Sequence, residues 1–142
     1  MKRFFLLNIL FLLVLGGCQA VGNAERVADE FHEKLDAHDH DYIIDNLIDP
    51  ESLESEGEEN WRSFLELISS WGEMTDRTSS TGFNYKSNNG ISTVKLEYTF
   101  NTDLGFVYEA LVLVDRGDGY KVMIASMNSD KSAVDEYTKE FD

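Results

Sequence analysis

The order of hydrophobic patterns in this 142-residue sequence predicts an α+β fold. In residues 24–71 apolar side chains recur at helical spacing, and from about Thr81 to Asn128 they alternate with a period of two. Helices that are followed by a run of strands are typical of the α+β class. We therefore expect N-terminal helices packed on a curved, four-stranded antiparallel meander, followed by a short C-terminal helix.

The N-terminal segment has the pattern of a secretory signal peptide. Lys2 and Arg3 precede the apolar run Phe4–Leu15, which leads through two glycines into Cys18. The run has 12 residues, whereas a membrane-spanning helix needs about 20. Cys18 is the only cysteine in the sequence, so an intrachain disulfide is excluded. The pattern therefore predicts an exported protein rather than one held by an uncleaved membrane helix.

The stretch Leu15-Gly16-Gly17-Cys18 resembles the lipobox of bacterial lipoproteins. In that family the cysteine, whose thiolate is a strong nucleophile, accepts the lipid and becomes the first residue of the mature protein. The resemblance implies that residues 1–17 are a lipoprotein signal peptide and that Cys18 anchors the protein in the cell envelope. Gln19 stands where Asp would retain such a protein in the inner membrane. The resemblance therefore favours the outer membrane if the host is Gram-negative.

The rest of the chain is divided into three parts. Residues 18–23 form the lipidated cysteine and a short tether, in which the five residues after Cys18 span at most about 18 Å. Residues 24–128 form the folded domain. Residues 129–142 form a C-terminal tail, in which Asp130 is the expected cap of a short helix. The domain is therefore expected to stay close to its membrane.

The charge balance excludes two kinds of partner. The sequence has 12 basic and 27 acidic residues, and loss of Lys2 and Arg3 with the signal peptide leaves a net charge near −17. Nucleic-acid binding depends on basic side chains that face phosphates, so no nucleic-acid partner is expected. A polybasic membrane patch is excluded for the same reason. The lipid on Cys18 is therefore expected to do the anchoring.

Three helices are predicted before the strands, at 24–37, 42–48 and 61–71. The second ends at Asp49-Pro50 because the residue before proline avoids helical angles. The acidic run 49–59 precedes the third helix, where negative charge complements the helix dipole. The apolar positions that define the three helices are Val27, Ala28, Phe31, Leu35, Tyr42, Ile43, Leu47, Ile48, Trp61, Phe64, Leu65, Ile68 and Trp71.

Four strands are predicted from the segments with period two. Asn88-Asn89-Gly90 is a hairpin signal between the first two strands. The segment 106–114 is apolar on both faces apart from Glu109, which predicts a central strand. A turn at 116–119 separates it from the last strand. The aromatic residues expected in or near the core are Phe31, Trp61, Trp71, Tyr98 and Phe100.

From Ala24 to Asn128 the order of elements is similar to the roll of nuclear transport factor 2-like, or cystatin-like, proteins. Members of that superfold include isomerases, dehydratases, binding modules and dimerisation domains, so the resemblance implies a fold and no single activity. The chain is most similar to small, uncharacterised bacterial envelope proteins with this roll. The residues that carry the resemblance are His38–Asp41, Trp61, Trp71, Glu109 and Gly119–Val122.

An enzyme with this roll would need an acid/base pair between the sheet and the helices. Its candidate side chains are Glu109, Asp41, Tyr42 and Tyr98. Glu109 is the lone charge in an apolar strand, where burial would disfavour its charged form. The alternatives for Glu109 are an outward-facing side chain or a buried pair with Lys95 or Lys121.

The three histidines of the sequence, His32, His38 and His40, lie within nine positions among several aspartates. His38 and His40 are two positions apart, so they point to different sides of a helix, and zinc demands a strict tetrahedral geometry. We therefore predict a solvated helix end here rather than a metal site, and we expect no cofactor.

The leading functional hypothesis is a membrane-anchored, non-enzymatic binding or interaction module, with a protein or small-molecule ligand that the sequence does not identify. The apolar strand 106–114 favours a homodimer through the outer face of the sheet. One alternative is a small enzyme or small-ligand carrier that uses Glu109 or Asp41 in a cavity. Another is an inhibitor or immunity-type protein that presents the acidic residues 49–59 to a basic partner.

Overall fold

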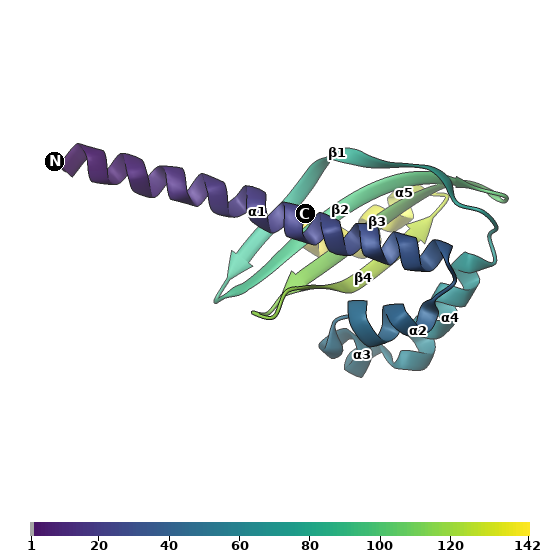
Figure 1. Ribbon diagram of the computed structural model, residues 1–142. Helices are drawn as coiled ribbons and strands as arrows, with labels where there is room; N and C mark the ends of the chain where they lie inside the picture. Colours follow the sequence, from purple (N-terminus) through teal and green to yellow (C-terminus); the bar gives the residue numbers. More distant parts are fainter. Residues whose placement is uncertain (1) are drawn as a thin grey trace.

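Four antiparallel strands form one sheet in the order β1-β2-β3-β4, and helices flank it, so the predicted α+β meander is confirmed (Figure 1). The computed structural model describes the backbone of residues 2–142 and the side chains from Cys18 onward, apart from Thr81. The strands are β1 (Thr75–Asn88), β2 (Ile91–Thr102), β3 (Gly105–Asp115) and β4 (Tyr120–Asn128). Short turns join them, as the pattern of the sequence requires.

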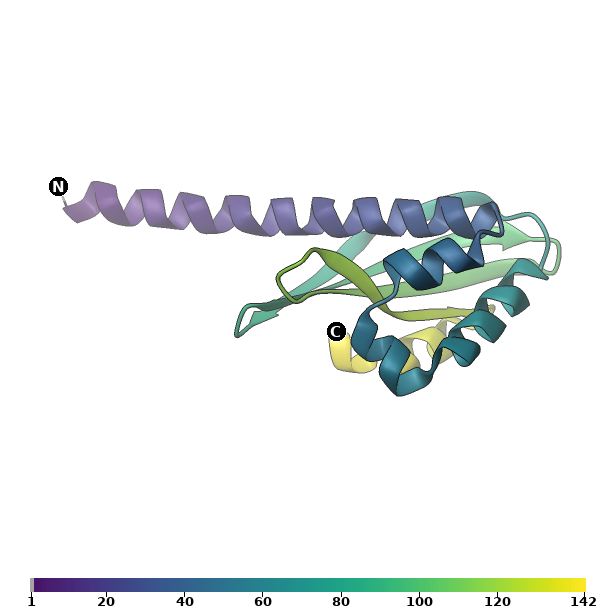
Figure 2. The same ribbon diagram turned by 60° about the horizontal axis from the view of Figure 1, so that its bottom comes forward.

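Helices lie on both faces of the sheet. The long helix α1 (Lys2–Asp36) crosses one face, and α5 (Lys131–Thr138), followed by a short 3₁₀ turn at Lys139–Phe141, lies on the other face (Figures 1 and 2). We call the face under α1 the inner face. Beyond the edge of the domain, α1 continues toward the N-terminus on the side where the β1–β2 and β3–β4 turns lie (Figure 2).

The segment between α1 and the sheet contains more helix than the sequence analysis predicts. It comprises α2 (His40–Tyr42), a π-helix at Ile43–Leu47, α3 (Pro50–Glu56) and α4 (Glu58–Ser69). The expected end of the second helix near Asp49-Pro50 is confirmed, but α3 was not predicted. Asp49 accepts a hydrogen bond from the backbone N–H of Ser52, and Pro50 takes the first helical position, which suits a residue without an N–H.

The core fills the space between α1, α4 and the inner face of the sheet. Ala24, Ala28, Phe31 and Leu35 follow one stripe of α1 and are all buried. Phe100, Trp61 and Tyr98 are buried as predicted, whereas Trp71 follows the end of α4 and is half-buried. The buried residues of the inner face are Val94, Leu96, Tyr98, Phe100, Val107, Glu109, Leu111, Leu113, Tyr120, Val122 and Met127.

The outer face of the sheet is covered in part by α5. Ala110 and Val112 of β3 are fully buried, as are Val134 and Thr138 of the helix. The two-sided apolar pattern of β3, which favours a homodimer in the sequence analysis, is thus matched by a helix of the same chain. A homodimer through the sheet stays a prediction, but this pattern does not require one.

The β1–β2 hairpin follows its sequence signal. Asn89 and Gly90 have φ of 52° and 80°, as a turn with two left-handed residues requires, and Asn and Gly adopt such angles most readily. The strand before the turn is longer than predicted, because β1 begins at Thr75 in a polar stretch. Backbone pairing with β2 extends this edge strand where its own side chains carry no hydrophobic pattern.

Residues 18–23 are helical rather than an extended tether. They continue α1 without a break, and both Val21 and Ala24 are buried against the domain. Six helical residues rise only about 9 Å, about half the reach expected of the tether. The physical reason is that the apolar stripe of the helix continues N-terminally as far as Val21, so packing holds the segment in helical form.

Candidate functional site

Cys18 is exposed on α1, where the helix leaves the domain. Its thiol is therefore accessible to modification. The side chains of residues 1–17, and with them the rest of the expected lipobox, lie outside the described residues. Among the described residues, no helix combines the length and the apolar character that crossing a membrane takes.

The predicted acid Glu109 is buried and paired with a histidine. Glu109 is 1% exposed and His32, on α1, is 4% exposed. The Nε2 atom of His32 lies 2.8 Å from Oε2 of Glu109, and the other carboxyl oxygen has no hydrogen-bond partner in the described part of the chain. The pair thus joins α1 to the centre of the sheet through one buried hydrogen bond.

Tyr98 completes this buried cluster. It lies opposite Glu109 in the β2–β3 register, and its ring packs edge-on against His32 with a centroid distance of 4.7 Å. Burial, followed by the nearby charge of Glu109, raises the pKa of Tyr98 well above its ordinary value of 10.0. A tyrosine that resists ionisation and a carboxyl group without solvent access form a structural cluster rather than a reactive one.

Both alternatives for Glu109, an outward-facing side chain and a buried pair with a lysine, are wrong, because Glu109 is buried and bound to His32. Lys95 lies opposite Val112 in the register and therefore projects to the outer face, whereas Glu109 projects to the inner face. Lys95 is buried beside the C-terminal turn and binds Asp142. Lys121 donates to the backbone carbonyl of Asn46. Alternation of side chains along each strand thus separates the acid from both lysines.

The second candidate acid, Asp41, is not brought to Glu109. Its side chain is largely exposed on α2 and accepts a hydrogen bond from Arg62 at 2.7 Å. The hydroxyl of the neighbouring Tyr42 donates to Glu30 on α1. Asp41 and Tyr42 therefore connect helices at the surface. Of the predicted candidates, the structure brings together Glu109 and Tyr98, in the buried cluster.

The three histidines have different environments. His32 is buried against Glu109, contrary to the expected solvated helix end, whereas His38 lies in the turn after α1 and His40 begins α2. His40 bonds to Ser69 of α4 at 2.8 Å, and burial and the neighbouring His38 lower its pKa. Within the described residues no three potential ligands are grouped for a metal ion.

The acidic run 49–59 is partly used inside the fold. Asp49 is buried, and its carboxylate accepts hydrogen bonds from Arg116 at 3.1 and 3.2 Å. Glu51 also pairs with Arg116, at 2.9 Å. The remaining acids project from α3 and from the start of α4: they are Glu54, Glu56, Glu58 and Glu59.

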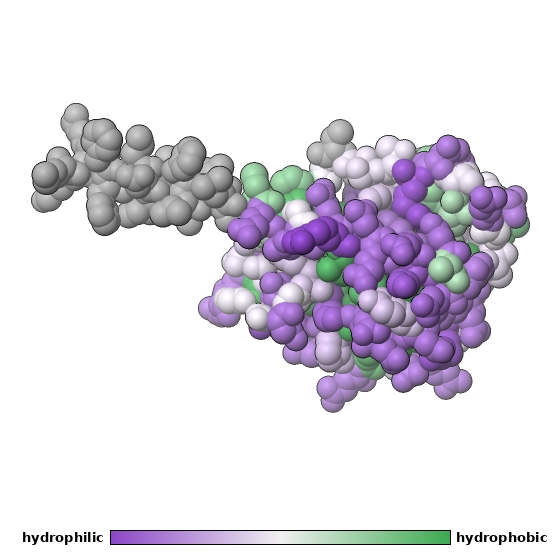
Figure 3. All heavy atoms as spheres, viewed as in Figure 1, coloured by the Kyte–Doolittle hydropathy of each residue, from purple (hydrophilic) through white to green (hydrophobic). Residues whose placement is uncertain are grey.

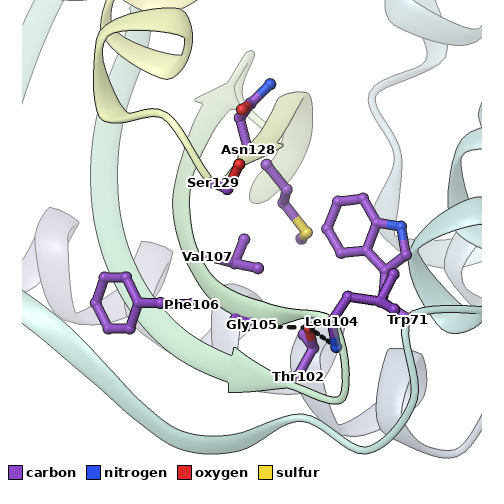
Figure 4. A pocket seen from close by; sticks show the side chains of 9 residues that line it. Trp71, Thr102, Leu104, Gly105, Phe106, Val107, Asn128 and Ser129 are labelled. Carbon is purple, nitrogen blue, oxygen red and sulfur yellow. Dashed lines mark hydrogen bonds between the residues drawn. The ribbon is translucent and has the colours of Figure 1, made fainter.

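A small pocket with both apolar and polar lining residues lies at the end of the sheet opposite to the exit of α1. Its volume is about 240 Å³. The Trp71 indole borders the pocket and Val107 points toward its middle, whereas the ring of Phe106 points away (Figure 4). The nine lining residues are Trp71, Thr102, Leu104, Gly105, Phe106, Val107, Met127, Asn128 and Ser129. None of these nine has a titratable side chain.

A second hollow lies between α4, β4 and α5, and it has acidic residues at its rim. Trp61, Phe64 and Tyr137 contribute aromatic surface, and Glu56 and Glu140 contribute carboxylates. The face of the molecule viewed in Figure 3 is mostly hydrophilic. In the two hollows, by contrast, aromatic side chains line a depression of the surface.

Comparison of the chain with models of known protein families and with curated protein sequences gives no match.

The buried pair of Glu109 and His32 was missed by the sequence analysis, although two signals point to it. Glu109 is the only charge in an apolar strand, and His32 lies four residues after Ala28, on the buried stripe of α1. A lone acid and a lone base on the two buried faces of a domain are expected to meet, because an unpaired buried charge is costly. Trp71 and Leu104 were not predicted as pocket residues, because they meet only through the fold.

Proposed function

We propose that this chain is an envelope lipoprotein, anchored through Cys18, whose domain binds a partner without catalysing a reaction. The observation that carries the proposal is the position of the pocket, which is lined by the β2–β3 turn. This turn lies at the end of the sheet opposite to the end from which α1 leaves the domain (Figure 1). An anchor at one end would direct this pocket away from the membrane. Its lining offers contact surface and backbone or hydroxyl groups, but no acid, base or thiol.

The size of the pocket favours a protein partner. Its volume of about 240 Å³ is below the range of roughly 300–1,000 Å³ that is usual for small-molecule sites. One large apolar side chain of another protein would fill it. Leu104 at its rim is 76% exposed, and exposed apolar groups around a pocket are typical of an interaction site.

The alternative of a small enzyme receives less support. Glu109 is enclosed and bound to His32, and Asp41 lies on the surface, so neither lines this pocket. General acid/base catalysis needs the reacting group within hydrogen-bond reach of a bound substrate. A buried pair inside a packed core does not meet that condition.

The anchor is tested by lipid labelling in the native host. Cys18→Ser should abolish incorporation of a labelled fatty acid and move the protein out of the lipid-anchored fraction, because a hydroxyl does not replace the thiolate. Gln19→Asp is the matched variant: it should keep the lipid and, in a Gram-negative host, shift the protein from the outer to the inner membrane. Full labelling of Cys18→Ser would contradict the proposal.

The pocket is tested by site-specific cross-linking in cells. A photoreactive amino acid at position Leu104 should give a discrete adduct with an envelope protein, and Trp71→Ala should weaken that adduct. The control position is Leu67 on α4, which is also well exposed but lies outside the pocket. Identical adducts from both positions would show that contact at the pocket is not specific.

A second candidate function is an inhibitor of a basic protein. The acids Glu56, Glu58 and Glu59 are exposed, and Glu56 borders the aromatic hollow beside α4. If this surface binds the partner, charge reversal of the three acids should abolish capture of that partner. Capture that survives the reversal would assign binding to another surface.

A further inference from the structure

We propose that the tip of the β1–β2 hairpin, residues 82–92, contacts the lipid surface beside the Cys18 anchor and thereby orients the domain. This inference rests on the proposed anchoring through Cys18. The occupant is the headgroup region of an anionic phospholipid membrane. The contact supplies orientation, while the lipid on Cys18 supplies the attachment.

The first observation is an unusual lack of acids. No Asp or Glu occurs from Arg77 to Leu96, a stretch of 20 residues in a chain that has 27 acids. The tip itself carries Lys86 as its only charge. An acidic surface is repelled by anionic headgroups, whereas a lysine near them is attracted. The hairpin tip itself therefore carries no charge that such a membrane would repel.

The second observation is exposed apolar surface on the same element. Phe83 is 54% exposed and Tyr85 is 40% exposed, and Ile91 follows the turn with 39% exposed. Phe83 and Tyr85 pair with Leu96 and Val94 of β2 and so project to the inner face, beyond the cover of α1. Amphipathic aromatic rings are enriched at the headgroup level of membranes. Contact with the membrane would therefore remove the exposed apolar surface of these side chains from water.

The third observation is the position of the tip relative to the anchor. The hairpin turn lies at the end of the domain from which α1 leaves, and there the hairpin diverges from the helix (Figure 2). Because residues 18–23 are helical and Val21 is buried, the domain cannot swing freely about Cys18. A lipid on Cys18 would therefore bring the hairpin tip to the membrane surface.

The charges on neighbouring elements define the direction of the contact. The β3–β4 turn at the same end carries Asp115 and Asp118 on either side of Arg116, whose charge is paired with Asp49 and Glu51. Helix α1 carries Glu25 beside Arg26. On the outer side of the hairpin, Lys86 donates to the backbone carbonyl of Glu140. The membrane should therefore repel the β3–β4 turn, and the domain should tilt so that the hairpin tip is nearest to the lipid.

The test uses the full-length protein, lipidated in its host and reconstituted into vesicles of phosphatidylethanolamine and phosphatidylglycerol. Because Cys18 is acylated, a new cysteine is the one free thiol. Asn88→Cys, at the hairpin turn, and Leu104→Cys, at the opposite end, are each labelled with a polarity-sensitive fluorophore. A lipid-borne quencher near the headgroups should quench the label at 88 several-fold more than the label at 104.

Equal quenching at the two positions would overturn the proposal. Ser87→Cys replaces Asn88→Cys if that variant does not fold. In the labelled hairpin, Phe83→Ser with Tyr85→Ser should reduce the quenching, whereas Leu67→Ser on α4 should leave it unchanged. Mass spectrometry of Cys18 distinguishes failure of the proposed anchor from failure of the hairpin contact. Absence of the lipid overturns both proposals, whereas a lipidated chain with an unquenched hairpin label overturns the hairpin contact alone.

Discussion

Replacement of His32 by leucine should destabilise the domain strongly, because it leaves the Glu109 carboxylate buried without a partner. Oε2 of Glu109 is hydrogen-bonded to Nε2 of His32, with 2.8 Å between the two atoms, and Oε1 has no partner among the described residues. Loss of one member of a buried pair costs about 3–5 kcal/mol. The total stability of such a domain is about 5–15 kcal/mol, so His32→Leu should unfold at a much lower urea concentration.

Two further variants separate the charge from the packing. Glu109→Leu should cost less, about 1–3 kcal/mol, because it leaves an imidazole rather than a carboxylate without a partner. His32→Leu combined with Glu109→Leu removes both polar groups and should equal the wild type or exceed it by about 1–4 kcal/mol. Urea unfolding followed by tryptophan fluorescence gives each free energy. A loss of less than about 1 kcal/mol in His32→Leu, the size of one ordinary hydrogen bond, would refute the reasoning.

Two other predictions concern the sheet and the turn that follows α4. Because the pKa of Tyr98 is raised, the folded state holds this proton to higher pH than the unfolded state does. The contribution of Tyr98 to stability should therefore be constant below pH 10.0 and fall as the pH rises above it. Tyr98→Phe should remove this part of the alkaline loss of stability, as measured by urea unfolding at a series of pH values. Gly72 has φ of +92°, and a Cβ there would lie 1.9 Å from Oδ2 of Asp103, so Gly72→Ala should cost about 1–2 kcal/mol. Gly82→Ala is the control, since nothing lies within 4 Å of its Cβ position, and equal thermal shifts of the two variants would contradict the strain argument.

The sheet was predictable because its information is local. Alternation of apolar and polar residues identifies β2, and the Asn-Asn-Gly turn requires left-handed angles that few other residues adopt. The start of β1 at Thr75 was not predictable in this way, because residues 75–80 are polar and are held as a strand by pairing with β2. Edge strands of this kind take their structure from a neighbour rather than from their own side chains.

In the segment between α1 and the sheet, one local signal has two structural consequences, of which only the first was predicted. Asp49-Pro50 marks the end of one helix, but the same two residues also cap and begin α3. The tether 18–23 likewise has no strong pattern of its own. It is helical because Val21 and Ala24 extend a stripe whose partner surface is a sheet more than 50 residues further along the chain.

The sequence by itself determines the α+β class, the meander, the main core residues and the chemistry expected at Cys18, because each depends on residues that are close together in the chain. The tertiary structure decides that Glu109 meets His32 rather than a lysine, since strand register and the face of α1 select its partner. It also decides that Trp71 and Leu104 border one pocket and that the β1–β2 hairpin lies at the Cys18 end. These relations join segments far apart in sequence, and packing alone brings them together.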